Sequence, residues 1–332
     1  MKPRERVLTS LEHEEPDRVP RVEIWINDDM VAELGYKDVQ SAHVGLGLDS
    51  VMIPAQIPAR SSYWRDGLDE WGQVWKDGVY VSGVVDTDAD LEEHSPPLDY
   101  VDEFFDAGRI KKSMERYPDH CFIYGSHIGP FTMGYMAMGF ARFFLAIRER
   151  PVFVRKLLEA RTEWCIAMCQ RAASLGVDLI VLGDDAGHRG GPMISPRMWH
   201  DFVLPCHRRI VDELDVSVIW HSDGGIESLL PMAIEAGFRG VHGLEPAAGI
   251  DLGKVKRAFG KNLILLGNVD VAVLCGSDLN AVRAEVTRCV EQGAPGGGYM
   301  LSSCNSIFKG MNPASVVQMY EYAGKIGLYQ TD

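Results

Sequence analysis

The chain has 332 residues, 46% of them hydrophobic and 24% charged, which is ordinary for a globular protein with a substantial core. Its net charge of −14 excludes a nucleic-acid-binding role, which needs a basic face, and disfavours a strongly anionic substrate. The chain has no apolar run long enough to span a membrane, no apolar secretory-signal core at its charged start and no CxxC pair among its seven cysteines, so we expect a cytoplasmic protein.

Short apolar runs that end in polar residues recur along the whole chain. In order, the eight runs are VPRVEIW (19–25), LDSVMIP (48–54), CFIYGSH (121–127), DLIVLGDD (178–185), VSVIWHSD (216–223), RGVHGLEP (239–246), NLILLGNVD (262–270) and GYMLSSCN (298–305). Runs of this kind are typical of strands that are buried on both faces.

Helical stretches separate most of these runs. Examples are 195–214, with Ser195 as N-cap and Pro196 in the first turn, 226–237, 277–293, and 312–327, which starts with Asn312 and Pro313. Strands that alternate with helices indicate a parallel sheet, and eight such units predict a (β/α)8 TIM barrel. A doubly wound open sheet is the alternative, but no GxGxxG follows the first run.

The long interval 55–120 differs from the other intervals. Its first half is rich in Trp, Tyr, Gly and Asp and predicts hairpins, and DTDADLEEHSPP predicts an exposed acidic loop. We interpret the chain as a single barrel domain over 1–332, with 55–120 as an insertion near the mouth of the barrel. Trp64, Trp71 and Trp75 then either line a pocket or pack in the insertion.

The barrel prediction brings the polar ends of the runs to one mouth, since active sites of this fold lie at the C-terminal ends of the strands. The residues expected there are Glu23, Asp49, His127, Asp184, Asp185, His221, Asp223, Glu245, Asn268, Asp270 and Cys304. We expect Glu23, Asp49, His127 and Asn268 to contact the substrate.

Three of these residues offer the ligand types of a zinc site. His221, Glu245 and Cys304 follow the fifth, sixth and eighth runs and combine imidazole, carboxylate and thiolate, which suits Zn²⁺ with an open fourth position. Asp223 is close enough in sequence either to bind the metal or to orient His221.

Asp184 and Asp185 stand on the glycine-rich loop GDDAGHRGGP (183–192) after the fourth run. Two adjacent acids cannot both point inward along one strand. We therefore expect one to act as acid/base or substrate clamp and the other to be a loop residue. Met133, Met136 and Met138 provide an apolar wall after the third run, for a flat hydrophobic ligand or for the core.

Several motifs together resemble the uroporphyrinogen decarboxylase superfamily. They are EEPDRVP near the start, GPFTMGYMAMG after the third run, the HxD at 221–223, GNVD at 267–270, and GGYMLSSCNSI before NPASVVQMYEYA. The resemblance covers essentially the whole chain in the same motif order, and it implies a (β/α)8 barrel.

Two chemistries occur in this superfamily. Its decarboxylases need no metal and clamp a polycarboxylate with an arginine-rich segment after the first strand, where this chain reads EIWINDDM without arginine. This departure disfavours uroporphyrinogen as substrate and leaves Asp49 without the arginines expected beside it. A metal-free decarboxylase of a smaller acid stays as the alternative, with Arg21, Arg60, Arg65 and Arg189 as candidate carboxylate ligands.

The other branch contains corrinoid-dependent methyltransferases, which carry zinc on His-x-Cys after strand five and on Cys after strand eight; a related methionine synthase branch adds a Glu after strand six. The resemblance implies His221, Glu245 and Cys304 as ligands, with Asp223 in place of the first Cys. Losing one thiolate gives a harder, more Lewis-acidic metal, which favours an ether oxygen.

We therefore expect a zinc-dependent methyltransferase for a small donor, such as an aryl methyl ether, with acid assistance from Asp184, Asp185 or Asp223. No segment resembles a DxHxxG cobalamin module, so the corrinoid would arrive on a partner protein. A homodimer is consistent with the family, and no membrane or nucleic-acid partner is expected.

Overall fold

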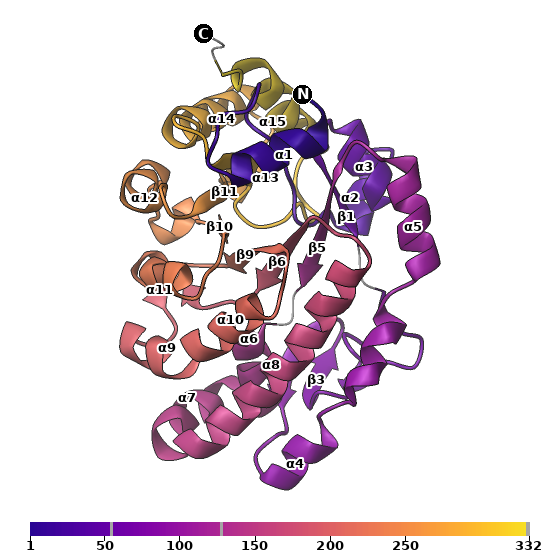
Figure 1. Cartoon of the computed structure of the whole chain (residues 1–332), viewed down its shortest axis with the longest axis vertical. Helices are drawn as coiled ribbons and strands as arrows, with labels where there is room; N and C mark the ends of the chain where they lie inside the picture. Colours follow the sequence, from indigo (N-terminus) through magenta and orange to yellow (C-terminus); the bar gives the residue numbers. More distant parts are fainter. Residues whose placement is uncertain (54–55, 127–128, 330–332) are drawn as a thin grey trace.

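A seven-stranded parallel sheet forms the centre of the computed structural model, which describes residues 1–53, 56–126 and 129–329 (Figure 1). In spatial order its strands are β1 (Ser50–Ile53), β5 (Cys121–Ser126), β6 (Leu179–Gly183), β9 (Ser217–Ser222), β10 (Gly240–Gly243), β11 (Ile264–Val269) and β12 (Tyr299–Ser303). Every neighbouring pair is parallel. Seven of the eight predicted apolar runs therefore form strands.

The remaining run, 19–25, closes the sheet into a barrel without forming a regular strand. On one side Val22 N donates to Leu301 O at 2.9 Å, and Leu301 N donates to Pro20 O at 2.8 Å. On the other side Asp49 N donates to Arg21 O at 2.7 Å, next to β1. Pro20 has no N–H and interrupts the ladder, which explains the irregular backbone. The predicted TIM barrel is confirmed, with this segment in the eighth position.

The interior of the barrel is apolar, and helix α1 (Pro3–Leu11) closes one end of it. Alternate strand residues such as Ile123, Val181 and Leu266 meet in one buried cluster with Val7 and Leu11 of α1. The helix is bonded to residues at or just before strand starts, for example by Arg4 N to Asp119 O and Ser10 Oγ to Tyr299 O. A ligand can therefore approach the barrel core only from the C-terminal ends of the strands.

Helices surround the sheet on the outside (Figure 1). In chain order they are α2 (Asp28–Glu33), α3 (Val39–Gly45), α4 (Asp88–Glu93), the 3-10 helix η1 (Leu98–Phe104), α5 (Ala107–Arg116), α6 (Pro130–Met138), α7 (Phe140–Glu149), α8 (Pro151–Ser174), α9 (Pro196–Phe202), α10 (Leu204–Asp212), η2 (Glu227–Leu229), α11 (Leu230–Glu235), η3 (Pro246–Ala248), α12 (Leu252–Phe259), α13 (Val271–Cys275), α14 (Leu279–Gly293) and α15 (Pro313–Ile326).

The predicted helices are found with corrected ends. The stretch 195–214 is two helices, α9 and α10, because Pro205 cannot donate a backbone hydrogen bond in a continuous helix. Ser195 caps α9 through Met198 N, and Asn312 caps α15, as predicted. The N-cap of α14 is Asp278, and η2 and α11 share the stretch 226–237.

The interval after β1 contains a small antiparallel sheet of β2 (Gly67–Leu68), β3 (Gln73–Lys76) and β4 (Val79–Gly83), which agrees with the predicted hairpins. The buried Asp69 carboxylate holds it together by accepting hydrogen bonds from Trp71 N, Gln73 N and Trp75 Nε1. The predicted acidic loop was wrong, because its centre is helix α4, capped by Thr87. The remaining strands, β7 (Gly187–His188) and β8 (Gly191–Pro192), form a separate two-stranded antiparallel sheet.

No single helix among the described residues is long and apolar enough to cross a membrane. The pair α6 and α7 reaches that length and composition only together, and it is bent by 104°. Gly139 forms the bend with a φ of 89°, which side chains with a Cβ rarely adopt. Nearly all of α6 is buried in the protein core.

Candidate active site

A polar cavity opens at the C-terminal ends of the strands. Its lining residues are Ile24, Trp25, Asn27, Trp64, Asp185, His221, Asp223, Asn305 and Ser306. Among the described residues, Asp185, His221 and Asp223 form one group whose nearest potential ligand atoms all lie within 4.8 Å of one another. His221 is the next-to-last residue of β9, and the two acids follow β6 and β9.

The two acids of this group are fixed by their neighbours. Asp185 Oδ1 accepts from Asp223 N at 3.0 Å, and Asp223 Oδ1 accepts from Asn305 Nδ2 at 2.7 Å. His221 Nε2 lies 3.5 Å from Asp223 Oδ1. Burial raises the pKa of Asp223 to about 6, the His221 ring opposes the rise, and the Asp185 and Glu245 carboxylates add to it. Two carboxylates and an imidazole with this spacing can hold a divalent cation.

Asp184 and Asp185 point to different sides of the chain, as their adjacency predicts. The fully buried Asp184 accepts from Phe131 N and Thr132 N at the start of α6, and its Oδ2 lies 2.7 Å from His207 Nε2. It is therefore placed to hold α6 and α10, and it is not among the described residues that line the cavity, so its assistance in catalysis stays a prediction. Asp185 is the acid that lines the cavity.

Glu245 and Cys304 lie near this group without joining it. Glu245 Oε2 accepts from Gly224 N at 3.0 Å, which ties it to the turn after β9. Cys304 is 2% exposed, and burial raises the pKa of its thiol, with a further contribution from the Glu245 carboxylate. The structure thus gathers His221 with Asp185 and Asp223, and it does not gather the predicted set of His221, Glu245 and Cys304.

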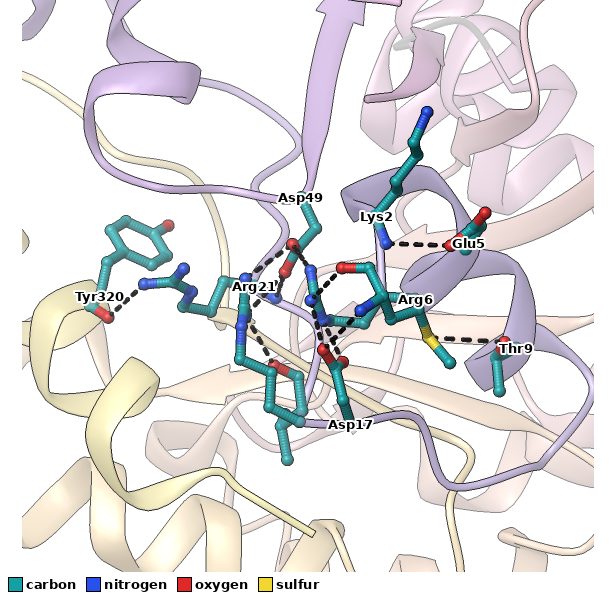
Figure 2. A network of polar contacts seen from close by, with 11 residues as sticks. Lys2, Glu5, Arg6, Thr9, Asp17, Arg21, Asp49 and Tyr320 are labelled. Carbon is teal, nitrogen blue, oxygen red and sulfur yellow. Dashed lines mark hydrogen bonds and ion pairs between the residues drawn. The ribbon is translucent and has the colours of Figure 1, made fainter. Parts of the chain in front are cut away.

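Asp49 does not line the cavity and lies in a network with arginine side chains, shown in Figure 2. It precedes β1, and its carboxylate is bonded to Arg6 Nη1 at 2.6 Å and to Arg18 Nη2 at 2.8 Å. It also accepts from Arg21 N. The expected substrate contact of Asp49 was wrong, because an acid before a strand lies at the closed end of a parallel barrel.

Glu23 and Asn268 are buried within the barrel wall and do not line the cavity. Glu23 accepts from Tyr320 Oη at 2.7 Å and Ser303 N at 3.2 Å, and burial raises its pKa to about 7. Asn268 Nδ2 donates to Leu244 O at 2.7 Å. Their expected contact with substrate stays a prediction, which this geometry does not support. The predicted residue His127 lies outside the described residues.

An aromatic chamber adjoins the polar cavity, and Trp25 and Trp64 line both. The other residues that line the chamber are Met52, Gln56, Ile57, Tyr63, Trp71, Phe104, Tyr124, Gly125, Met133, Trp164 and Met168. Trp64 and Trp71 of the insertion are therefore lining residues, whereas Trp75 packs with its Nε1 on Asp69. The insertion and the barrel build this chamber together.

The described residues that line the two spaces include no arginine and no lysine. Of the arginines considered for a decarboxylase, Arg21 bonds to Tyr320 O, Arg60 pairs with Glu103, and Arg65 bonds to Ala59 O. Arg189 is exposed on the β7–β8 turn. This arrangement gives a carboxylate substrate no cationic partner among the described residues of either space.

Sequence patterns missed several residues of the site. Trp25 ends the first apolar run, and Asn305 ends the last run, so both could have been found by their position at a strand end. Tyr124 lies inside a strand, and Tyr63 lies in the insertion, where nothing in the sequence marks them.

Comparisons with known proteins give the family of the chain. The family model described as uroporphyrinogen decarboxylase (URO-D) matches residues 73–326. The chain is 25% identical over 345 residues to the methylcobamide:CoM methyltransferase MtbA of Methanosarcina mazei, with 95% of each chain covered. It is 27% identical over 212 residues to the uroporphyrinogen decarboxylase of Thioalkalivibrio sulfidiphilus, which covers 60% of this chain and 58% of that one.

A solved structure has the same fold. The methyltransferase from Methanosarcina mazei superposes with a TM-score of 0.80 at 20% identity and covers 98% of this chain and 99% of that chain. The closed barrel described above is therefore the fold of both proteins.

Proposed function

The chain belongs to the uroporphyrinogen decarboxylase family, and within it we propose a zinc-dependent methyltransferase that moves a methyl group from a small methoxylated aromatic donor to a corrinoid protein. The observation that carries this proposal is the group of Asp185, His221 and Asp223 at the edge of an aromatic chamber that has no cationic side chain among its described lining residues.

Two observations favour methyl transfer over decarboxylation. The methyltransferase MtbA of Methanosarcina mazei aligns over 95% of the chain, and the uroporphyrinogen decarboxylases that match align over 51% to 85% of it. A decarboxylase of a small acid needs a cation to hold the carboxylate, and the described lining residues provide none.

The donor atoms of the group fit zinc. Imidazole nitrogen and carboxylate oxygen are both common zinc ligands, and three protein ligands leave a position for a substrate oxygen. A bound Zn²⁺ would supply a positive charge that polarises the ether oxygen and stabilises the phenolate left when the methyl group departs. A set with two carboxylates and no thiolate favours such an oxygen ligand over a thiol.

His221 belongs to both ligand sets under consideration. In the set that the structure gathers, Asp185 and Asp223 complete the site, with Asn305 orienting Asp223. In the set predicted from the sequence, Glu245 and Cys304 complete it. We propose the gathered set, because its atoms are already within 4.8 Å of one another.

The aromatic chamber would hold the ring of the donor. Trp71, Tyr63 and Trp164 meet edge to face around it, with ring centroids 5.2 Å apart for Tyr63–Trp71 and 5.4 Å apart for Trp71–Trp164. Flat apolar rings bind well among such side chains, and water is excluded from the methyl ether beside the polar group.

For the cellular compartment, the domain organisation and the partners of the enzyme, we propose what the sequence predicts. All seven cysteines are free, which fits a reducing cytoplasm. We propose that residues 1–332 fold as one domain, with the insertion as part of the site. The corrinoid would be carried by a partner protein at the open mouth, and a homodimer is compatible with this arrangement.

The proposal is tested with zinc-loaded protein, free cob(I)alamin as methyl acceptor and 2-methoxyphenol as donor. We expect methylcobalamin and catechol to form in equal amounts, and the His221→Ala variant to form neither. Methyl transfer from dimethyl sulfide but from no methoxyarene would contradict the substrate class, and transfer that survives complete removal of zinc would contradict the metal.

A further inference from the structure

A second buried histidine lies directly behind His221. His242 of β10 is the register partner of His221 of β9, and their Nδ1 atoms are 2.7 Å apart. His242 is fully buried. Its hydrogen-bond partners are His221, the Ser302 hydroxyl and the Ser303 carbonyl, none of which carries a formal negative charge.

The direction of the hydrogen bond between the two rings follows from the far side of His242. Its Nε2 lies 3.1 Å from Ser303 O, which can only accept, so Nε2 carries a proton. Ser302 Oγ, 3.3 Å from the same Nε2, donates onward to Glu23 Oε1 and can accept from the ring. Because His242 is fully buried and none of its hydrogen-bond partners carries a negative charge, a protonated ring would be an uncompensated buried charge, so the ring is neutral.

A neutral ring with its proton on Nε2 has a lone pair on Nδ1. His221 must therefore donate its Nδ1 proton to His242. This leaves the Nε2 of His221 as the atom that faces Asp223 and the polar cavity. The assignment holds for His221 in either charge state, because Nδ1 carries a proton in both.

We propose that His242 is a positioning residue, which accepts the Nδ1 proton of His221 and thereby fixes the tautomer and direction in which His221 offers Nε2 to a metal. The metal itself rests on the proposed function. Such hydrogen bonds behind a ligand histidine orient the ring and raise its basicity. Glu23 and Tyr320 anchor the far end of this chain, which gives the buried carboxyl a structural role.

The first test is independent of any metal. The nitrogen NMR shifts of the ten histidines are measured in metal-free, full-length protein with labelled histidine. Signals of the pair are assigned by their loss in His221→Gln and His242→Asn variants. We expect His221 with a protonated Nδ1, and His242 protonated only on Nε2. An unprotonated Nδ1 on His221 would overturn the proposal.

The second test measures Zn²⁺ affinity by competition with a chromophoric chelator. His242→Asn places an acceptor oxygen near the position of Nδ1, whereas His242→Gln and His242→Leu do not. We expect the Gln and Leu variants to bind Zn²⁺ about 10- to 100-fold more weakly, and the Asn variant to bind close to wild type. The buried His43, bonded to Ser50 O, provides a matched control in His43→Asn.

The two tests separate the two claims. Equal Zn²⁺ affinity in all three His242 variants would overturn the positioning role, and so would an Asn variant as weak as the Leu variant at an unchanged melting temperature. If wild-type protein binds no Zn²⁺, the zinc in the proposed function is contradicted. The NMR measurement of the two tautomers still tests the role of His242 in that case.

Discussion

At the scale of single residues, two adjacent aspartates have different roles: Asp184 stabilises the fold, and Asp185 belongs to the proposed metal site. We predict that Asp184→Ala lowers the free energy of unfolding by about 3 kcal/mol, because it leaves two amide groups and His207 without their buried partner. Asp185→Ala should cost about 1 kcal/mol, since one hydrogen bond to Asp223 N is lost. Urea unfolding in metal-free buffer measures both.

For zinc binding and methyl transfer, we expect the larger loss in Asp185→Ala and the smaller loss in Asp184→Ala. Asp185→Ala is expected to lose both, whereas folded Asp184→Ala protein should keep its zinc. A stable Asp184→Ala protein, or an Asp185→Ala protein with full zinc content, would show that the two side chains have been assigned the wrong roles.

Glu23 gives a pH dependence of stability. Its pKa rises from 4.5 to about 7 on folding, so the folded chain holds more protons than the unfolded chain between these values. Stability must therefore fall as pH rises through this window, by an amount on the order of 3 kcal/mol. Glu23→Gln removes the ionisable group and keeps the hydrogen-bonding shape.

We predict that the stability of Glu23→Gln relative to wild type increases from about pH 5 to about pH 8 in urea unfolding. The exposed Glu321 of α15 offers a control in Glu321→Gln. A difference that does not change with pH would mean that Glu23 is already ionised in the folded protein at low pH.

Single residues also show why part of the site could not be predicted from patterns in the sequence. His221 and Asp185 were found because they follow apolar strands on the side where a barrel opens. Asp49 was misplaced, because it stands near the start of its run and β1 starts at the next residue. The pairs His207–Asp184 and His242–His221 depend on register between distant segments, which no local pattern contains.

At the scale of elements, the insertion provides one wall of the aromatic chamber. Asp69 holds Trp71 N, Gln73 N and Trp75 Nε1, so its loss should loosen the small sheet while leaving the barrel intact. We predict that Asp69→Ala raises KM for 2-methoxyphenol about tenfold, equivalent to about 1.4 kcal/mol of binding, with unchanged zinc content.

Asp66→Ala is the matched control for this prediction. Asp66 accepts from Asp77 N on the exposed part of the same hairpin region. Equal KM values for the two variants would contradict a role of the insertion in holding the donor.

Elements were predicted well where burial alone decides them. Parallel strands covered on both faces appear as continuous apolar runs, and seven of eight such runs are strands. The exception contains Pro20, whose missing donor breaks the ladder. Helix ends were less predictable, since Asp278 rather than Ser277 caps α14, and either side chain could serve there.

At the scale of the whole molecule, the closed end and the open end of the barrel have different tasks. Helix α1 and the arginines around Asp49 seal the N-terminal ends of the strands (Figure 2). The C-terminal ends carry the polar group and the aromatic chamber. A partner protein that brings a large cofactor can therefore reach the reacting methyl group only from the open end.

The zinc content of three purified proteins tests the central claim most directly. We predict about one zinc ion per chain in wild type and in Cys304→Ala, and loss of zinc in Asp223→Ala, measured by elemental analysis after dialysis. Absence of zinc from wild-type protein, or its loss in Cys304→Ala together with its retention in Asp223→Ala, would contradict the metal site of Asp185, His221 and Asp223.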